Sequence, residues 1–462
     1  MTWYLLLLLP LWVAAREPAG QNIIFILVDG YSSSLLNSSR SESSVGIKEL
    51  QEHGVQAEYL KASFPTQSWP NYFTLVTGLH TENHGFTADY MWDEKSGMTF
   101  ERGQGDNDTE DIWWDGRPAP FWYTAGKQNV DIHCYWFAHC HRAHYDLVVQ
   151  VPAKRRMDLS TTGQTDKLGD IFPEMIKRIT KYQAYKQQMF LVRYGELEEA
   201  QRLHGKNSDE VARSLGKLDM YLHELQRQIE EHKLDTSTNI IVASPHGLHS
   251  LEDEEQFFLE ECLSDYSKVK KVVNAHSMLM VFTDAEDEGN IHFELRVCDQ
   301  WAPMGDYEDT DTPLVKVYKM SELPDDFHWK NSRFMSGVVL ITKPGASIIT
   351  RELPSVPAPS NIQKDLKMTS GWEPEHTSMR GIFLARGPAF KAGETFPSMD
   401  LVDIYQCILN ILGIEPPHAH NGTWDNVGRM MTEGWEERHS SDKFNSAVLI
   451  SPLLVIILSL FF

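Results

Sequence analysis

The sequence predicts an α/β protein with a doubly wound, mostly parallel sheet, and two kinds of segment carry this prediction. Strand-like apolar runs occupy residues 22–28, 188–193 and 239–243, and a polar or glycine-containing turn follows each run. Such runs are typical of strands buried on both faces of a parallel sheet. Between them, residues 165–187 and 209–232 repeat apolar side chains at helical spacing. Strands that alternate with helices favour a parallel sheet covered by helices on both faces.

Later segments complete this architecture. Residues 381–385 repeat the pattern of the earlier strands, and residues 402–412 form an amphipathic helical pattern that stops at Gly413. Residues 251–361 mix strand-like pieces with acidic and proline-rich loops. We therefore expect one large domain over residues 20–430, with 251–361 as a smaller inserted cap region.

Both ends of the chain carry targeting patterns. Residues 1–15 resemble a secretory signal peptide cut after Ala15, the alternative being a buried N-terminal strand. Residues 448–462 are apolar to the last residue, but are fewer than the roughly 20 that a spanning helix needs. A polar stalk at 431–447, with the small residue Ser440, precedes them. This order is typical of a glycosylphosphatidylinositol (GPI) signal with attachment at Ser440, and the alternative is a short tail anchor.

The mature part has features of a secreted glycoprotein. Sequons begin at Asn37, Asn107 and Asn421. An odd number of cysteines, five, indicates one free thiol or an intermolecular bond. The net charge of −23 argues against binding to nucleic acid or, by charge alone, to anionic lipid. We expect the protein at the cell surface, on the outer leaflet of the plasma membrane.

A family resemblance is carried by the long segment 64–85, which begins Phe-Pro-Thr-Gln-Ser-Trp-Pro-Asn, and by the turn Val-Asp-Gly at 28–30. Both resemble the nucleophile segment and first metal-ligand turn of the ectonucleotide pyrophosphatase/phosphodiesterase family. The resemblance extends over residues 22–424 and implies a fold of the alkaline phosphatase superfamily. The motifs at 90–93, 113–114, 135–136 and 379–385 look most like the choline-specific glycerophosphodiesterase branch, which is also GPI-anchored.

This resemblance implies a phosphodiesterase site with two zinc ions about 3.5–4 Å apart, flanking a serine or threonine nucleophile. Ser68 matches the nucleophile position, and Asp29 and His246 match two of six metal-ligand positions. Glu198 matches a third position and retains a carboxylate that is able to bind metal.

The remaining positions depart from the family pattern. Arg202, Pro245 and Ser370 stand where metal ligands are expected, and Asp89 replaces an asparagine that helps to hold a phosphate oxygen. A carboxylate at Asp89 would repel a phosphodiester. Three histidines are near enough in sequence to be considered as replacement ligands: His204, His249 and His376. His204 faces away from Glu198 on a helix, whereas His249 would share a face with His246 if a helix begins there.

Two features allow both a structural and a functional interpretation. Arg202 lies four residues after Glu198, so an ion pair is the favoured interpretation, and binding of phosphate by its guanidinium is the alternative. Four tryptophans either line a pocket for a quaternary ammonium group or pack in the core: Trp92, Trp113, Trp114 and Trp136.

The sequence thus predicts a pseudoenzyme that binds a choline-type or phosphocholine-type ligand, or a cell-surface protein, with no metal or a single divalent ion. One alternative is a residual or metal-altered phosphodiesterase that hydrolyses choline-containing glycerophosphodiesters through Ser68. A third hypothesis is an adhesion or receptor ectodomain without a small-molecule role.

Overall fold

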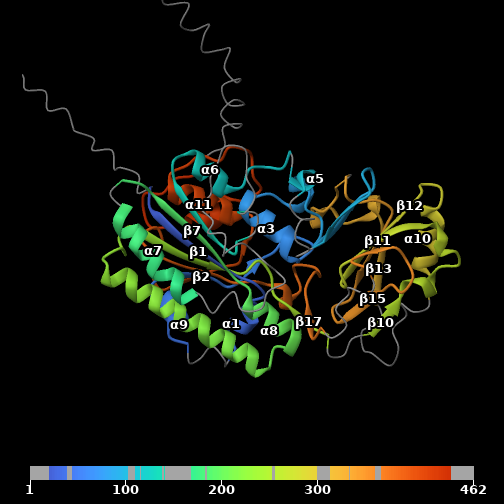
Figure 1. Ribbon diagram of the computed structural model, residues 1–462, viewed down its shortest axis with the longest axis horizontal. Helices are drawn as coiled ribbons and strands as arrows, with labels where there is room; N and C mark the ends of the chain where they lie inside the picture. The colour runs from blue at the N-terminus through green and yellow to red at the C-terminus, as the bar shows by residue number, and fades with distance from the viewer. Residues whose placement is uncertain are drawn as a thin grey trace, which may run out of the picture.

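The computed structural model describes residues 20–38, 44–101, 110–114, 116–137, 140, 168–182, 185–251, 255–298, 313–331, 333–358 and 366–438. Two sheets organise these residues, and the smaller lies to one side of the larger (Figure 1). The predicted signal peptide at 1–15, the attachment residue Ser440, the tail at 448–462 and the sequon at Asn107 lie outside the described residues.

The larger sheet has seven strands, and its centre is parallel. Strand β1 (Asn22–Val28) lies between β8 (Thr238–Ala243) and β7 (Gln188–Tyr194) and runs parallel to both. Next to β7, and parallel to it, is β6 (Asp131–Tyr135). On the other side of β8 the order continues with β18 (Phe383–Arg386), β2 (Val55–Ala57) and β19 (Glu394–Phe396).

The strand β18 corrects one expectation. The apolar run at 381–385 was predicted as another strand of the parallel set, but β18 is antiparallel to both β8 and β2. A strand buried on both faces needs apolar residues whichever way it runs, so hydropathy alone does not encode its direction.

Helices cover both faces of this sheet, as predicted. Alternate side chains of β1 enter different hydrophobic clusters, with Phe25 on one face and Ile26 on the other. The Phe25 face is covered by α3 (Ser68–Thr77), α6 (Phe121–Lys127) and α11 (Asp403–Leu412). The Ile26 face is covered by α2 (Gly46–Glu52), α7 (Leu168–Tyr182), α8 (Glu196–His204) and α9 (Asp209–Glu231).

Local signals set the ends of these helices. The Ser208 side chain caps α9 by accepting a hydrogen bond from the backbone N–H of Val211. At the other end of the chain, Gly413 has a φ of 76° and ends α11 in the left-handed conformation. The helix predicted over 165–187 is described over Leu168–Tyr182 as α7.

The smaller sheet lies within the predicted insert. Its order is β13 (Val315–Lys319), β14 (Val338–Thr342), β12 (Met278–Thr283), β11 (Val269–Asn274) and β16 (Ser355–Val356). One face is covered by α10 (Glu288–Arg296), and the other packs on residues of the larger part such as Phe64. Two short pairs flank it: β10 (Glu255–Phe258) with β15 (Ala346–Ile349), and β4 (Tyr90–Asp93) with β5 (Met98–Glu101).

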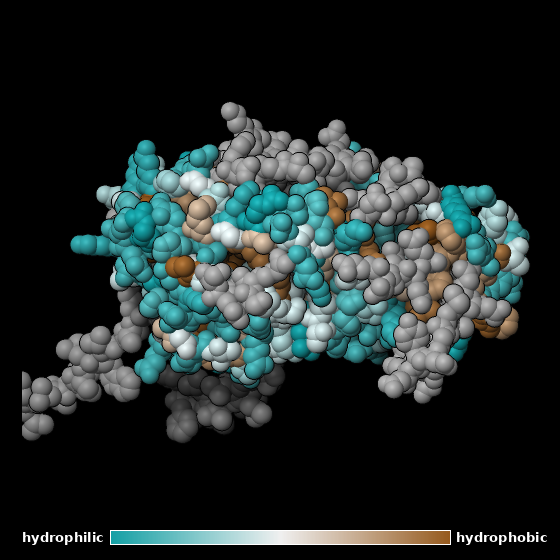
Figure 2. All heavy atoms as spheres, turned by 90° about the horizontal axis from the view of Figure 1, so that it is seen from below, coloured by the Kyte–Doolittle hydropathy of each residue, from teal (hydrophilic) through white to brown (hydrophobic). Residues whose placement is uncertain are grey.

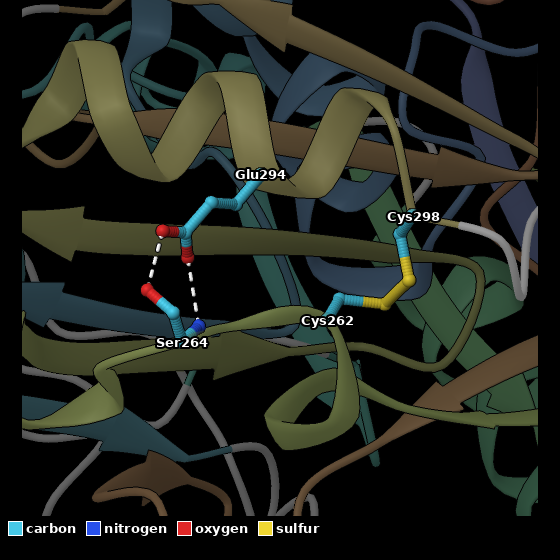
Figure 3. The surroundings of a disulfide bond; sticks show 4 residues. All are labelled: Cys262, Ser264, Glu294 and Cys298. Carbon is cyan, nitrogen blue, oxygen red and sulfur yellow. Dashed lines mark hydrogen bonds between the residues drawn. A yellow bond between two sulfur atoms is a disulfide. The ribbon is translucent and has the colours of Figure 1, made fainter.

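Two disulfides and one thiol account for the five cysteines. Cys262–Cys298 joins the end of α10 to the segment before β11, and Glu294 of α10 accepts two hydrogen bonds from Ser264 beside it (Figure 3). Cys134–Cys140 closes a small loop. Cys407 is a free thiol buried in the core, which agrees with the free-thiol alternative and not with an intermolecular bond.

The surface is mixed in polarity. Figure 2 shows a face that is largely hydrophilic, with hydrophobic residues in small separate patches. Among the described residues, no helix has the length and apolar character needed to cross a bilayer.

Candidate functional site at the carboxyl ends of the central strands

The predicted site residues gather where β1, β7 and β8 end. Asp29 follows β1, Glu198 lies in the first turn of α8 after β7, and His246 follows β8. Parallel neighbours bring their carboxyl ends to one edge of a sheet, which is where ligands bind in such folds. Gly30, with a φ of 71°, permits this meeting, because a Cβ there would lie 3.2 Å from Glu198 Cα.

Ser68 and His246 are in direct contact. Ser68 is the first residue of α3, and its Oγ lies 3.1 Å from His246 Nε2. His246 Nδ1 lies 2.9 Å from the carbonyl oxygen of Gly247. Because a carbonyl only accepts, Nδ1 carries the proton and Nε2 accepts the hydrogen bond from the Ser68 hydroxyl. Both side chains are fully buried.

Asp29 is held by groups of the protein itself. Its Oδ2 accepts hydrogen bonds from the Tyr72 hydroxyl and from Arg193 Nε, while its Oδ1 is buried with no hydrogen-bond partner. Arg193 Nη2 also lies 3.7 Å from Glu198 Oε2. Arg193 therefore stands between two carboxylates at which the resemblance implies metal ligation.

The sequence reasoning did not single out Arg193. It was treated as the end of an apolar strand, although an arginine in a strand buried on both faces is itself unusual. That lone charge was the available signal, because a buried guanidinium needs a carboxylate partner nearby.

Arg202 forms the predicted ion pair and reaches further. Its Nε lies 2.9 Å from Glu198 Oε1, one helical turn earlier on α8. Its Nη1 lies 3.4 Å from Thr369 Oγ1, and its Nη2 lies 3.5 Å from Ser370 Oγ. The guanidinium of Arg202 thus connects Glu198 and Ser370, two further positions at which the resemblance implies metal ligands.

These donors do not fit a pair of zinc ions. Glu198 faces two guanidiniums, one oxygen of Asp29 is bound by Arg193, and His246 Nε2 is directed at Ser68. Across the part of the chain that the structure describes, no group of three or more His, Cys, Asp or Glu side chains is placed to hold a metal ion. The guanidiniums of Arg193 and Arg202 would also repel a divalent cation placed beside Glu198.

Asp89 lies at the N-terminus of α3, beside Ser68. Its Oδ1 accepts the backbone N–H of Trp69 at 2.8 Å, and its own backbone N–H donates to Gln67 Oε1 at 2.8 Å. The helix dipole favours a negative charge at this end. The N-terminus of α3 would attract an anion, and the carboxylate of Asp89 already occupies it.

The other histidines do not join Asp29 and His246. His204 is exposed at the end of α8, away from the buried Glu198. No helix begins directly after His246, so the condition for a shared helical face is not met: His249 lies in the short strand β9 (His249–Ser250), paired with β17 (Met368–Thr369). His249 and His376 instead share Ser378, at 3.1 Å and 2.7 Å from its Oγ, and burial lowers the pKa of both histidines.

The four tryptophans do not form a common pocket. Trp113 and Trp114 lie in the cluster under α3, Trp136 lies in the cluster on the opposite sheet face, and Trp92 packs edge-on against Phe282 of the smaller sheet. Their placement in three clusters favours core packing over a shared pocket, since large rings contribute most when buried.

The two sequons within the described residues are exposed. Asn37 follows the short helix α1 (Ser33–Leu36), and Asn421 lies in a loop, where its Oδ1 accepts the backbone N–H of His80 at 3.0 Å. Both positions are accessible for glycosylation.

Comparisons with known proteins agree on one family. The model of the type I phosphodiesterase / nucleotide pyrophosphatase family matches residues 23–373. The chain is 25% identical over 394 residues to bis(5'-adenosyl)-triphosphatase enpp4 of Xenopus laevis, covering 84% of this chain and 77% of the relative. It is 24% identical over 398 residues to the corresponding Bos taurus protein, covering 84% and 78%.

Solved structures show the same fold. Human ectonucleotide pyrophosphatase / phosphodiesterase 5 is similar with a TM-score of 0.73 at 21% identity, covering 89% of this chain and 100% of that chain. An inactive variant of the murine protein in complex with AMP gives a TM-score of 0.72 at 20% identity, with the same coverage. The chain therefore shares the fold of these proteins, an α/β fold as predicted. With the family model spanning most of its length, this chain belongs to the ectonucleotide pyrophosphatase/phosphodiesterase family.

Proposed function

We propose that this protein is a catalytically silent member of its family, which binds a ligand or partner at the cell surface without turning it over. The observation that supports this most is the position of Arg202, whose guanidinium contacts Glu198 and Ser370. In a two-metal phosphodiesterase, the cations acidify the nucleophile and neutralise the phosphoryl group. A guanidinium supplies charge, but it does not coordinate a serine oxygen and acidify it.

The charge balance of the site supports the same proposal. At their ordinary charges, Asp29, Glu198 and Asp89 carry three negative charges, against the two positive charges of Arg193 and Arg202. The site is thus close to neutral with its own side chains. A buried carboxylate is tolerated when a partner compensates it, and here the guanidiniums provide that compensation.

The proposed location rests on the ends of the sequence. The signal-peptide pattern at 1–15 and the apolar tail at 448–462 support secretion and GPI anchoring at Ser440. Phosphatidylinositol-specific phospholipase C should release the protein from intact cells. Retention on the cells after this treatment would favour the tail-anchor alternative.

The proposed ligand is of the choline type, and its support is the resemblance of four motifs to the choline branch. A nucleotide is the competing ligand, because one solved relative is described in complex with AMP and others are named bis(5'-adenosyl)-triphosphatases. Thermal stability measured with choline, phosphocholine and AMP separates these ligands, since a ligand that binds the folded state raises the midpoint.

The central experiment measures metal and turnover on the same purified sample. We expect well under one zinc per chain by elemental analysis, and hydrolysis of nitrophenyl phosphocholine no faster than in the Ser68→Ala variant. A triple variant with Arg202→His, Pro245→Asp and Ser370→His restores the family's ligand types and serves as the comparison for zinc uptake. Two zinc ions per wild-type chain, with Ser68-dependent turnover, would overturn the proposal.

A residual hydrolase is the second candidate, favoured by one specific observation. Ser68 donates to a histidine nitrogen whose tautomer is fixed by Gly247, which is the arrangement of an activated hydroxyl nucleophile. This candidate requires slow turnover that is lost in both Ser68→Ala and His246→Ala. Measuring the rate with and without added Zn²⁺ or Mn²⁺ tests the single-divalent-ion version of the same site.

A further inference from the structure

We propose that Arg202, Thr369, Ser370 and His276, here called the Arg202 cluster, form a metal-independent binding site for a single oxyanion group such as a phosphate or carboxylate. This inference rests on the proposed function, because it names the chemistry by which a site without zinc would hold its ligand. It is supported by N–H groups of Arg202 and His276 for which the protein supplies no strong acceptor.

The guanidinium of Arg202 has donors to spare. An arginine presents five N–H groups in a planar fork. Three contacts are made, one to Glu198 at 2.9 Å and two long ones to the hydroxyls of Thr369 and Ser370 at 3.4 and 3.5 Å. The Arg202 side chain is 19% exposed, whereas Glu198 is 3% exposed. The terminal nitrogens therefore remain available for a bidentate oxyanion, while Nε holds the arginine in place.

His276 comes to this cluster from the insert. It lies in the turn between β11 and β12, with a φ of 66° that few residues other than glycine adopt. No hydrogen bond joins the ring of this half-buried residue to any residue that the structure describes. Desolvation, and then the charge of Arg202, lower the pKa of His276 to about 4. At neutral pH its imidazole is therefore uncharged, with one N–H to donate.

The turn that carries His276 is fixed against the turn that carries Ser370. Ser277 Oγ donates to the carbonyl oxygen of Ser370 at 3.1 Å. Gly371, with a φ of 117°, allows this approach, because a Cβ there would lie 2.1 Å from Ser277 Oγ. The turn that contains His276 is thus held against the turn that contains Ser370, so little ordering of these two turns is needed when a ligand binds.

The groups of the cluster favour a negatively charged ligand over a positively charged one. Arg202, two hydroxyls and a neutral imidazole all donate, and the nearest acid, Glu198, already faces Arg193 and Arg202. His249 is paired in register with Thr369, and its pKa is lowered by burial and by the charges of His376 and Lys206. A ligand rich in acceptors matches this surface, and an ammonium group does not.

The test is titration calorimetry on the purified protein in buffer containing a metal chelator. Inorganic phosphate and acetate are the probes for the two sources of an oxyanion, and choline is the cationic control. We expect saturable binding of phosphate, acetate or both, which choline does not compete away. Arg202→Gln should weaken that binding at least about tenfold, because a charge-assisted hydrogen bond is lost. Arg213→Gln removes an exposed arginine of the neighbouring helix and should change nothing.

His276→Asn supplies a second variant, since asparagine tolerates the left-handed conformation and Glu198 keeps its partner. We expect it to weaken oxyanion binding about threefold or more, with unchanged thermal stability. Binding of wild-type protein only to choline, or affinities for the oxyanions unchanged in both Arg202→Gln and His276→Asn, would overturn the inference. Neither result depends on zinc content or turnover, so a failure here is distinct from a failure of the proposed function.

Discussion

Single residues decide the chemistry of this site. Asp29, Ser68 and His246 match the family site only by the resemblance in sequence, and each makes its contacts within the protein: Asp29 with Tyr72 and Arg193, and Ser68 with His246. Asp29 is fully buried, and a buried charge is stable only while its partner remains. Arg193 and Arg202 therefore compensate the buried carboxylates of Asp29 and Glu198.

Removing Arg193 tests this role. Arg193→Gln leaves Asp29 without its guanidinium and Glu198 with only one, so we expect the free energy of unfolding to fall by about 3–5 kcal/mol. Urea unfolding followed by fluorescence measures the change. The exposed pair of Arg213 with Glu210 provides the matched control, for which Arg213→Gln should cost about 1 kcal/mol or less. A loss for Arg193→Gln as small as the control's would show that these carboxylates do not depend on it.

Asp89 gives a second prediction at this scale. Asp89→Asn keeps an oxygen to accept the N–H of Trp69 and removes a negative charge beside Ser68. We expect phosphate to bind several-fold more tightly to this variant, since repulsion between like charges is lost. Calorimetry under the conditions used for the wild type measures the change. Unchanged or weaker binding would mean that Asp89 does not face the ligand.

At the scale of elements, the start of α11 contains an acid with a raised pKa. Asp403 is buried and accepts hydrogen bonds from the backbone of Asp400 and Thr423 and from the side chain of Asn426. Burial raises its pKa to about 6, although these hydrogen bonds act in the opposite direction. Asp403 thus connects the loop that contains Asn421 to α11, and its contribution to the free energy of unfolding depends on pH.

The sign of this pH dependence follows from the raised pKa. The folded state holds the Asp403 proton up to about pH 6, while the unfolded chain releases it near pH 4. The stabilising contribution of Asp403 is therefore complete below about pH 4 and is lost as the pH rises to about 6. The total loss is about 3 kcal/mol, and the contribution does not change further at higher pH. Urea unfolding at pH 4.5, 5.5 and 7 should show this slope in the difference between wild type and Asp403→Asn. If the free energy of unfolding changed with pH in the same way in the wild type and in Asp403→Asn, the raised pKa of Asp403 would be contradicted.

At the scale of the whole molecule, two sheets are joined through the site. The insert contributes the turn with His276 and Ser277, and the larger part contributes Ser370 and Arg202, so the stability of the insert affects the geometry of the cluster. The disulfide Cys262–Cys298 closes a loop over a sequence separation of 36 and joins the end of α10 to the segment before β11, within the insert (Figure 3).

Opening this disulfide should loosen the insert. We expect the Cys262→Ser and Cys298→Ser double variant to lose about 3–4 kcal/mol, as chain entropy predicts for a loop of this length. Differential scanning calorimetry measures the loss, and limited proteolysis should cut first within 251–361. The Cys407→Ala variant is a control that changes a cysteine without opening a loop. Cleavage that begins in the larger part would contradict the expected order.

The sequence by itself determined the elements and the family. The central strands, the helices α9 and α11, and the ion pair between Glu198 and Arg202 depend on spacing within a few residues, which periodicity and helical geometry reveal. The 64–85 segment predicted the family, and the family model and the shared fold confirm it.

Only the tertiary structure decided what surrounds those elements. Arg193 meets Asp29 across 164 positions of sequence, and the insert brings Ser277, next to His276, to Ser370. The direction of β18 and the separation of the four tryptophans were likewise not encoded locally. Spacing along the chain fixes which side chains share a face of one element, but the partner of a buried charge is set by how distant elements pack, and that packing decided the chemistry of this site.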